Sequence, residues 1–306
     1  MSTPRNASRG RGVGRSIGHH GELLQGRFRC LVQGECPGLV TVPIGTVGSV
    51  AVFAPDASGA VRARASGGAR DLGKARRAAE ATLAHLRECD ALGCTGGELR
   101  IARTTAVGLG LGSSTADVLA AVRAVADCAG VELDADIVAR LAVAAEGASD
   151  PLWADRPILF AHRHGHVIEE LGETLPAMLL VRCVLGGPVD TLALPPAGAG
   201  DVAEYEELRA QLRRAVSAGD AAGVAAVATR SALLNQSRHH KPGLDRLIAA
   251  AERGGALGVQ VAHSGNVAGL LFDREHPRDR LRRACTRVRA VGFRVADVPI
   301  VIGGVA

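Results

Sequence analysis

The sequence has few of the residues on which several common functions depend. Aromatic residues make up 2% of the 306 residues, and Lys74 and Lys241 are the two lysines. Proteins that bind single-stranded nucleic acid stack bases on aromatic side chains, so this composition argues against that class. Mechanisms centred on a lysine, such as a Schiff base, have only these two candidates. The excess of 36 basic over 31 acidic residues is modest and suits a protein that handles anionic small molecules.

Closely paired cysteines are missing as well. The seven cysteines are scattered, odd in number and never spaced as Cys-x-x-Cys, which argues against a disulfide framework and a zinc knuckle. We therefore expect reduced and mostly buried thiols. These residues are Cys30, Cys36, Cys89, Cys94, Cys128, Cys183 and Cys285.

Long apolar runs are also absent, since none approaches the roughly 20 residues that span a bilayer. Residues 1–15 are rich in Arg, Gly and Ser without an apolar segment, which argues against a secretory signal. We therefore expect a cytoplasmic protein with no membrane partner, whose residues 1–14 form a disordered basic tail. The length suggests two domains of about 150 residues each, and the apolar content suffices for a core in both.

The hydrophobic pattern changes its organisation near residue 172. Before it, we expect strands over 39–65 and 98–105 and a hairpin that joins 158–160 to 167–168, with its turn near Gly165. The helices expected there span 73–88, 113–129 and 134–145. After it, the order of elements resembles a ferredoxin-like α+β half. Its expected strands span 177–184, 259–262, 267–272 and 293–302, and its helices span 201–218, 221–235, 242–253 and a last segment opened by Pro277.

A glycine-rich turn precedes the helix expected from residue 113. Three glycines spaced by two allow backbone conformations that side chains would forbid, and Ser113, Ser114 and Thr115 follow them. Free backbone N–H groups at a helix start bind anions, and hydroxyls add ligands for phosphate or magnesium. The turn is neither a P-loop nor the dinucleotide fingerprint. Taken alone, it fits a phosphate site and an ordinary serine-capped helix equally well.

Three separated blocks occur in one order along the chain. They are Ser16-Ile-Gly-His-His-Gly-Glu-Leu-Leu-Gln-Gly26, the Gly-Ser-Ser-Thr-Ala-Asp segment that ends at Asp117, and Val261-Ala-His-Ser-Gly-Asn-Val-Ala-Gly-Leu-Leu271. This layout resembles the GHMP kinase superfamily, which phosphorylates small alcohols with ATP. From about residue 14 to 273, the chain is similar to the L-threonine kinases of the PduX type. The similar blocks include Gly186–Leu192, Ser231–Gln236 and Lys241-Pro242.

The resemblance implies an α+β class and the two-domain GHMP kinase fold. Residues 15–172 would form an N-terminal ATP-binding half like domain 2 of ribosomal protein S5, and residues 173–306 a ferredoxin-like half. In such kinases the active site lies between the halves, and the serine loop holds the triphosphate. The ATP-binding residues would be Gly108, Gly110, Leu111, Gly112, Ser113, Ser114 and Thr115.

The resemblance also implies transfer of the ATP γ-phosphoryl group to the hydroxyl of L-threonine, with Mg²⁺ as a second cofactor. The products are O-phospho-L-threonine, which in this family serves cobalamin biosynthesis, and ADP. Two residues depart from the pattern, because Ile17 replaces a usual proline and Leu109 replaces an expected basic residue. Another hydroxy amino acid or small alcohol, in natural-product biosynthesis, therefore stays open as the acceptor.

Two carboxylates follow the third expected helix, in Glu146-Gly-Ala-Ser-Asp150-Pro. The segment resembles the family's Glu-x-Thr-Asp, whose Asp faces the substrate, so Asp150 is the expected base or hydroxyl-orienting group. An Asp-Pro turn is the alternative. Glu146 is either a magnesium ligand or an ordinary helix end. Ser114 and Asp117 are the expected metal ligands, although Asp117 also suits the helix dipole alone.

Several polar residues are candidates for binding the acceptor. Glu22 lies between glycines and suits an amino group or the metal, although a solvated strand end would also explain it. The turn at 263–266 suits a carboxylate, although it is also a common hairpin. The substrate-binding candidates are His20, Glu22, Asn235, His263, Ser264 and Gly265. A zinc site on His162, His164 and His166 is disfavoured, because Gly165 predicts a turn that breaks their shared face.

Two functions of other classes stay open on the sequence. An S5-like half and a basic tail suit an RNA-binding module, but basic stripes with aromatic residues are lacking, so we expect no nucleic-acid partner. An ATP-binding regulator without catalysis is the second. The oligomeric state is not fixed by the sequence, and a homodimer stays open.

Overall fold

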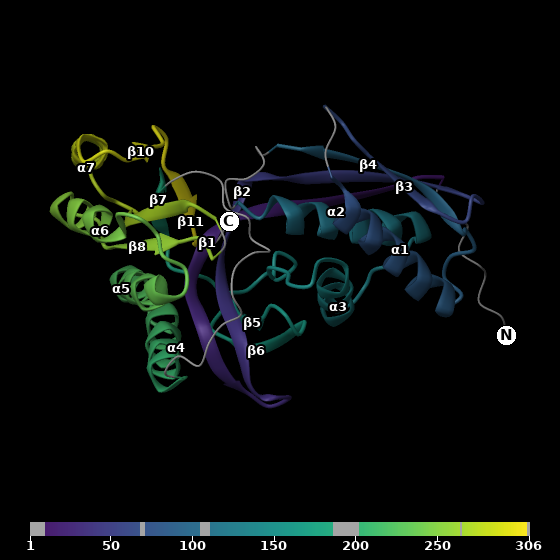
Figure 1. Ribbon diagram of the computed structural model, residues 1–306, viewed down its shortest axis with the longest axis horizontal. Helices are drawn as coiled ribbons and strands as arrows, with labels where there is room; N and C mark the ends of the chain where they lie inside the picture. Colours follow the sequence, from purple (N-terminus) through teal and green to yellow (C-terminus); the bar gives the residue numbers. More distant parts are fainter. Residues whose placement is uncertain (1–9, 68–70, 105–110, 186–201, 264, 305–306) are drawn as a thin grey trace.

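The computed structural model describes residues 10–67, 71–104, 111–185, 202–263 and 265–304 (Figure 1). The strands are β1 (Gly12–Cys30), β2 (Gly34–Asp56), β3 (Val61–Ala65), β4 (Gly96–Arg103), β5 (Ile158–Ala161), β6 (His166–Glu170), β7 (Met178–Val184), β8 (Gly258–Val261), β9 (Val267–Asp273), β10 (Arg294–Val295) and β11 (Ile300–Ile302). The helices are α1 (Gly73–Glu88), α2 (Ser113–Ala129), α3 (Ala135–Glu146), α4 (Val202–Ser217), α5 (Ala221–Leu234), the short 3-10 helix η2 (Asn235–Ser237), α6 (Leu244–Arg253) and α7 (Arg278–Ala290). The gaps leave Gly108, Gly110, Ser264 and residues 186–192 outside the described residues.

A long antiparallel hairpin of β1 and β2 runs through both halves of the molecule (Figure 1). The sheet order β10-β7-β9-β8-β1-β2-β4-β3 continues from one half to the other, and Glu22 pairs with Val261 where β1 meets β8. Register shifts interrupt β1 between His19 and Leu24. Such bulges bend a strand and redirect its side chains, as here where the two halves join.

Helix α2 lies at the centre of the N-terminal half, and 13 of its 17 residues are buried. Glycines on β1 allow this close approach, because a Cβ on Gly12 or Gly14 would collide with the α2 backbone. The alanines of α2 complete the fit, and α1 and α3 pack against the same helix. The core of this half therefore fixes the position of the α2 N-terminus.

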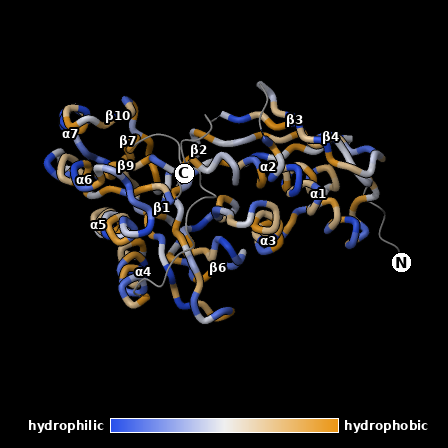
Figure 2. Tube along the Cα trace, viewed as in Figure 1, coloured by the Kyte–Doolittle hydropathy of each residue, from blue (hydrophilic) through white to orange (hydrophobic). Residues whose placement is uncertain are grey.

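The C-terminal half is built around β7, β8 and β9. Helices α4 and α5 share one apolar cluster with β1, and α6 and α7 share another with the inner strands. Hydrophobic segments recur along the strands and helices of both halves (Figure 2). Within the described ranges, no helix combines the length and apolar character that a membrane span requires.

Most predicted helices and strands are confirmed. The expected disordered tail over 1–14 was wrong at its end, because strand β1 begins at Gly12, and residues 1–9 lie outside the described residues. The meander expected over 39–65 was wrong, because most of it belongs to the long strand β2. The single closing strand over 293–302 was also wrong, since β10 and β11 pair separately with β7. Pro242 does not open a helix, because α6 begins at Leu244 after Gly243. The domain boundary at 172/173 falls between β6 and β7 and stays a prediction, because one sheet crosses both halves.

Candidate active site

The N-terminus of α2 begins with Gly112 in the left-handed conformation, at φ 68°. A Cβ at this position would collide with the imidazole ring of His19, so glycine satisfies both the conformation and the space. The His19 backbone N–H donates to the Leu111 carbonyl at 3.2 Å. The first backbone N–H groups of the helix have no partner within it and are available to an anion.

The Leu111 side chain points away from such an anion. It is 3% exposed and packs against Ala262 and Val267 of the C-terminal half. Only its backbone is therefore available to a ligand. This contact places the start of α2 at the junction of the two halves.

A cavity of about 380 Å³ opens beside the start of α2. Lys74 and Arg103 contribute two cationic groups to its wall, which sequence reasoning did not assign to the site. The lining residues are Asp71, Leu72, Lys74, Ala75, Arg103, Ser113, Ser114 and Asp117. Hydroxyls, cations and a helix start around one cavity form an environment suited to phosphate groups.

Asp117 holds one of these cations in place. Its carboxylate accepts hydrogen bonds from the Arg103 guanidinium, with Nε 2.7 and 2.8 Å from the two oxygens, and from the Ser49 hydroxyl at 2.5 Å. Asp117 is 2% exposed. These contacts occupy the carboxylate and favour a role in positioning Arg103, while metal binding by Asp117 stays a prediction.

Glu146 lies beside the serine segment. Its carboxylate accepts hydrogen bonds from Ser114 Oγ at 3.1 Å and from Thr115 Oγ1 at 2.9 Å, and Lys74 Nζ lies 3.9 Å away. Burial, reinforced by the charge of Asp150, raises the pKa of Glu146 to about 7. A buried carboxylate next to hydroxyls is an oxygen donor set of the kind that hard divalent cations prefer.

Asp150 is paired with His19, a contact between residues 131 positions apart that the sequence did not reveal. His19 Nε2 lies 3.1 Å from Asp150 Oδ2, and Thr115 Oγ1 donates to the same oxygen at 3.2 Å. His19 Nδ1 lies 3.0 Å from the Gly21 backbone nitrogen. Burial alone would lower the pKa of His19, but the charges of Asp150 and Glu22 and the hydrogen bond to Asp150 raise it to about 9. Burial raises the pKa of Asp150, but the attraction and hydrogen bond of His19 outweigh it and bring that pKa to about 2.

Glu22 faces His19 from the other side. Its Oε1 lies 3.8 Å from His19 Nδ1, and the His263 backbone N–H donates to its Oε2. Burial raises the pKa of Glu22 to about 7. His19, Glu22 and Asp150 each have one ligand atom within 4.8 Å of the others. The predicted site residues Glu22 and Asp150 thus lie together, with His19 between them.

The turn after β8 brings polar groups of the C-terminal half to this site. His263 Nδ1 lies 2.5 Å from Gln25 Oε1, and the Lys241 ammonium donates to the Gly265 carbonyl. Burial lowers the pKa of Lys241, and it lowers that of His263 to about 3. The His263 backbone therefore contacts Glu22, and Gly265 contacts Lys241, a buried cation that sequence reasoning did not assign to the site.

Two predicted substrate contacts lie apart from this group. His20 has no exposed surface, and its Nδ1 lies 2.5 Å from Gln260 Nε2. Asn235 donates through Nδ2 to the carbonyls of Gln25 and Ser231, both at 2.8 Å, and so ties α5 to β1. These contacts favour positioning roles for both residues.

The alternating histidines do not share one strand face, because the turn at Gly165 separates them. The His162 ring lies 5.4 Å from that of His263, at the site described above. His164 lies within the turn and His166 begins β6, with ring centroids 6.2 Å apart. The expectation that Gly165 breaks the alignment is confirmed.

Comparison with known proteins gives the family. Residues 74–158 match the GHMP kinases N terminal domain, and residues 208–290 match the GHMP kinases C terminal model. The chain belongs to the GHMP kinases. The family indicates an ATP-dependent phosphotransferase, in agreement with the anion-binding helix start and the cationic cavity beside it.

Among characterised relatives, this GHMP kinase is similar to two L-threonine kinases. It is 29% identical to that of Citrobacter freundii over 201 residues, which is 60% of this chain and 65% of the relative. It is 28% identical to that of Salmonella typhimurium over 193 residues, 58% of this chain and 60% of the relative. Each match thus spans less than two thirds of the relative's length.

Solved structures confirm the two-domain GHMP kinase fold. Homoserine kinase from Cytophaga hutchinsonii aligns with a TM-score of 0.69 at 14% identity, covering 100% of this chain and 98% of that one. Lactococcus lactis galactokinase, complexed with galactose, aligns with a TM-score of 0.64 at 14% identity, covering 96% and 94%. At such identities the likeness concerns the fold alone.

Proposed function

We propose that this GHMP kinase transfers the γ-phosphoryl group of ATP to the side-chain hydroxyl of L-threonine, forming O-phospho-L-threonine and ADP. The similarity to the two L-threonine kinases supports the acceptor. One structural observation carries the reaction itself. The helix start that suits phosphate and the His19-paired carboxylate of Asp150 meet at Thr115, whose hydroxyl donates to Asp150 and Glu146.

Phosphate binding is assigned to the start of α2. Ser113 and Ser114 line the cavity at the helix start that follows Gly112, and Lys74 and Arg103 would offset the negative charge of the nucleotide. Asp117 keeps Arg103 on the cavity wall through its two-oxygen contact. The predicted residues Gly108 and Gly110 lie outside the described residues, and their role in ATP binding stays a prediction.

Magnesium is assigned to Ser114 and Glu146, in place of the predicted pair of Ser114 and Asp117. The raised pKa of Glu146 marks a buried charge that a cation would stabilise, whereas the Asp117 oxygens already have Arg103 and Ser49. A bound Mg²⁺ would neutralise the charge that develops on the transferred phosphoryl group. The Lys74 ammonium, 3.9 Å from Glu146, would act on the same side of the phosphates.

Asp150 is assigned to the acceptor hydroxyl. Its low pKa keeps it ionised at neutral pH, so it accepts a hydrogen bond from that hydroxyl and directs a lone pair of the hydroxyl oxygen at the phosphorus. A carboxylate with a pKa of about 2 is a weak base. Asp150 would therefore accept the proton of the acceptor hydroxyl late in the reaction, because that hydroxyl becomes acidic as its oxygen bonds to phosphorus. His19 holds Asp150 in this state and orientation.

Recognition of the amino acid is assigned to the polar groups at the junction of the halves. An ammonium group would offset the buried charge of Glu22, and the Lys241 ammonium would bind the carboxylate. Both charged ends of the acceptor would then be held on the side of Asp150 that faces the C-terminal half. His20 and Asn235 would support this arrangement from behind.

The acceptor is tested by coupled measurement of ADP release with L-threonine, L-serine, L-homoserine and no acceptor. We expect kcat/KM for threonine to exceed that for the other two by at least about tenfold, since the hydroxyl position and the methyl group both differ. Phosphothreonine is identified by mass spectrometry. Turnover with threonine equal to the no-acceptor control would rule out this function. Higher turnover with homoserine would move the acceptor to another hydroxy amino acid.

A further inference from the structure

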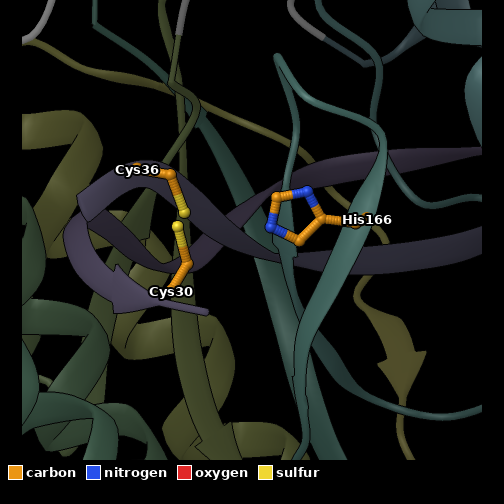
Figure 3. Close-up of side chains that lie close together, drawn as sticks. All are labelled: Cys30, Cys36 and His166. Atoms are coloured by element: carbon orange, nitrogen blue, oxygen red, sulfur yellow. The ribbon is translucent and has the colours of Figure 1, made fainter. Parts of the chain in front are cut away.

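Three side chains of metal-ligand type meet away from the active site, at the tip of the β1–β2 hairpin. Cys30 ends β1, Cys36 lies near the start of β2, and His166 begins β6 (Figure 3). One ligand atom of each lies within 4.8 Å of the others. Cys36 has no exposed surface and Cys30 is 9% exposed, packed with Ala161. The hairpin turn thus brings together two cysteines whose spacing in the sequence did not indicate a site.

The imidazole of His166 gives a second, independent observation. Its Nε2 atom is buried and has no hydrogen-bond partner within the described part of the chain. Figure 3 shows the ring edge turned toward the two sulfur atoms. Buried polar atoms are rarely left without a partner, so an unpartnered nitrogen facing two thiols points to a missing ligand.

We propose that Cys30, Cys36 and His166 bind one Zn²⁺ ion through two thiolates and one imidazole nitrogen. Tetrahedral zinc with bonds of about 2.3 Å to sulfur and 2.0 Å to nitrogen places its ligand atoms about 3.5–3.8 Å apart. The ligand atoms lie within 4.8 Å of one another, so each pair reaches this geometry with a shift of at most roughly 1 Å. A water molecule completes the fourth position, because His164 is engaged by Gln33 at 3.1 Å.

The charge of the surroundings agrees with this assignment. Two thiolates balance the two positive charges of zinc, and neutral imidazole adds none. In the absence of a metal, burial and the neighbouring Cys30 raise the pKa of the Cys36 thiol to about 12, and the charges of Arg27 and Arg209 only partly oppose this. A disulfide between Cys30 and Cys36 would explain why the two sulfur atoms are close, but it would leave His166 Nε2 without a hydrogen-bond partner. A bound metal would explain the positions of all three side chains.

The site would fasten β6 to the β1–β2 hairpin. In the described residues, β6 pairs with β5 alone. A single residue pair, Leu39 with Phe160, joins the β5–β6 hairpin to β2. A metal held by β1, β2 and β6 would add a cross-link between the two hairpins. Its expected role is stabilisation of this region, independent of the reaction proposed above.

Cobalt titration of the full chain under reducing conditions tests the site, because tetrahedral Co²⁺ bound to thiolates absorbs through sulfur-to-metal charge transfer. We expect this absorption to saturate at about one equivalent and to disappear when Zn²⁺ displaces Co²⁺. The His19, Glu22 and Asp150 cluster contains no sulfur, so the signal reports only on the hairpin site. The variants Cys36→Ser and His166→Ala should weaken binding by at least about tenfold, whereas Cys89→Ser, at an exposed cysteine, should not.

The wild-type chain alone can overturn the proposal, even if a variant fails to fold. Absence of the charge-transfer absorption, with thiol counting that shows Cys30 and Cys36 reduced, would rule out the metal site. A Cys30–Cys36 disulfide found by peptide mass spectrometry in chain purified with reductant, and without bound zinc, would also rule it out. One zinc per chain after purification, lost in Cys36→Ser but kept in Cys89→Ser, is the supporting result.

Discussion

Asp150 owes its ionised state to one neighbour, since His19 Nε2 lies 3.1 Å from its Oδ2. The substitution Asp150→Asn keeps the size of the side chain and removes the charge that orients the acceptor hydroxyl. We expect kcat to fall about 10²- to 10⁴-fold, with little change in KM for ATP, because the carboxylate faces the acceptor. Steady-state ADP release with threonine measures both constants. Asp155→Asn, at an exposed acid five residues later, is the matched control, and an unchanged kcat in Asp150→Asn would refute the assignment.

Glu146 links activity and stability through its proton. Burial raises its pKa from 4.5 to about 7, so between these pH values the folded chain holds a proton that the unfolded chain has lost. The free energy of unfolding therefore falls as pH rises through this window. Glu146→Gln should raise the free energy of unfolding at pH 8 by about 1–3 kcal/mol and change it little at pH 4.5. Denaturant unfolding at both pH values measures this, with Glu88→Gln on the surface as control.

The same proton should govern catalysis. If Glu146 holds Mg²⁺, the acidic limb of kcat/KM falls below about pH 7 in the wild type, because the protonated carboxyl does not bind the cation. Glu146→Gln would then lose magnesium-dependent turnover while gaining stability at pH 8. A variant that is less stable at pH 8, or that keeps its magnesium dependence, would contradict this account.

Single residues of the site differ in how far the sequence could predict them. Ser113, Ser114 and Asp150 were found because they belong to a local motif or a family block. The pairing of His19 with Asp150 was not, because it joins β1 to the segment after α3 and depends on the folded sheet. Lys74 was discounted for the same reason, since only packing of α1 against α2 brings it to the cavity.

At the scale of elements, the turn into α2 has one position where only glycine fits. Gly112 combines a positive φ with direct contact to the His19 ring. Gly59 has a similar φ of 75° but open space around it, so Gly59→Ala measures the conformational cost alone, about 1–2 kcal/mol. Gly112→Ala should cost more than this, and it should also raise KM for ATP because the helix start and His19 are displaced. Thermal unfolding and ATP titration check both effects, and equal costs for the two variants would count against the tight contact.

Helices were predicted more accurately than strands for a physical reason. A helix is stabilised by contacts three and four residues apart, so the pattern over 73–88 and 113–129 gave the bounds of α1 and α2 directly. Strand β2 contains Pro43, Gly45 and Gly48, which locally indicate turns. In the structure these residues are accommodated because β2 pairs with β1 along the whole hairpin, with register shifts at irregular positions. The sequence of β2 alone does not reveal this, because the pairing depends on β1.

At the scale of the whole molecule, the two halves share a sheet and a site. The β1–β8 contact at Glu22 and Val261 lies beside His19 and Asp150, so the groups proposed to act in catalysis lie at the junction of the two halves. The two-domain fold was predictable from family blocks, but the continuous sheet was not. It arises because β1 pairs with β2 along its length and with β8 at a single residue pair.

This continuity predicts that the chain unfolds as one unit and responds to ligands as one unit. With Mg²⁺-ATP at about 100 times its Kd, binding should add about 2.7 kcal/mol to the free energy of unfolding. For a chain of this length, that corresponds to a rise of about 4 °C in Tm, and scanning calorimetry should show one transition that shifts as a whole. If the halves were independent, two transitions would appear and ATP would move only that of the N-terminal half, because α2 and its cavity lie there. Threonine added to saturating ATP separates the cases further, since its proposed contacts reach from Glu22 to Lys241 and would shift the single transition again.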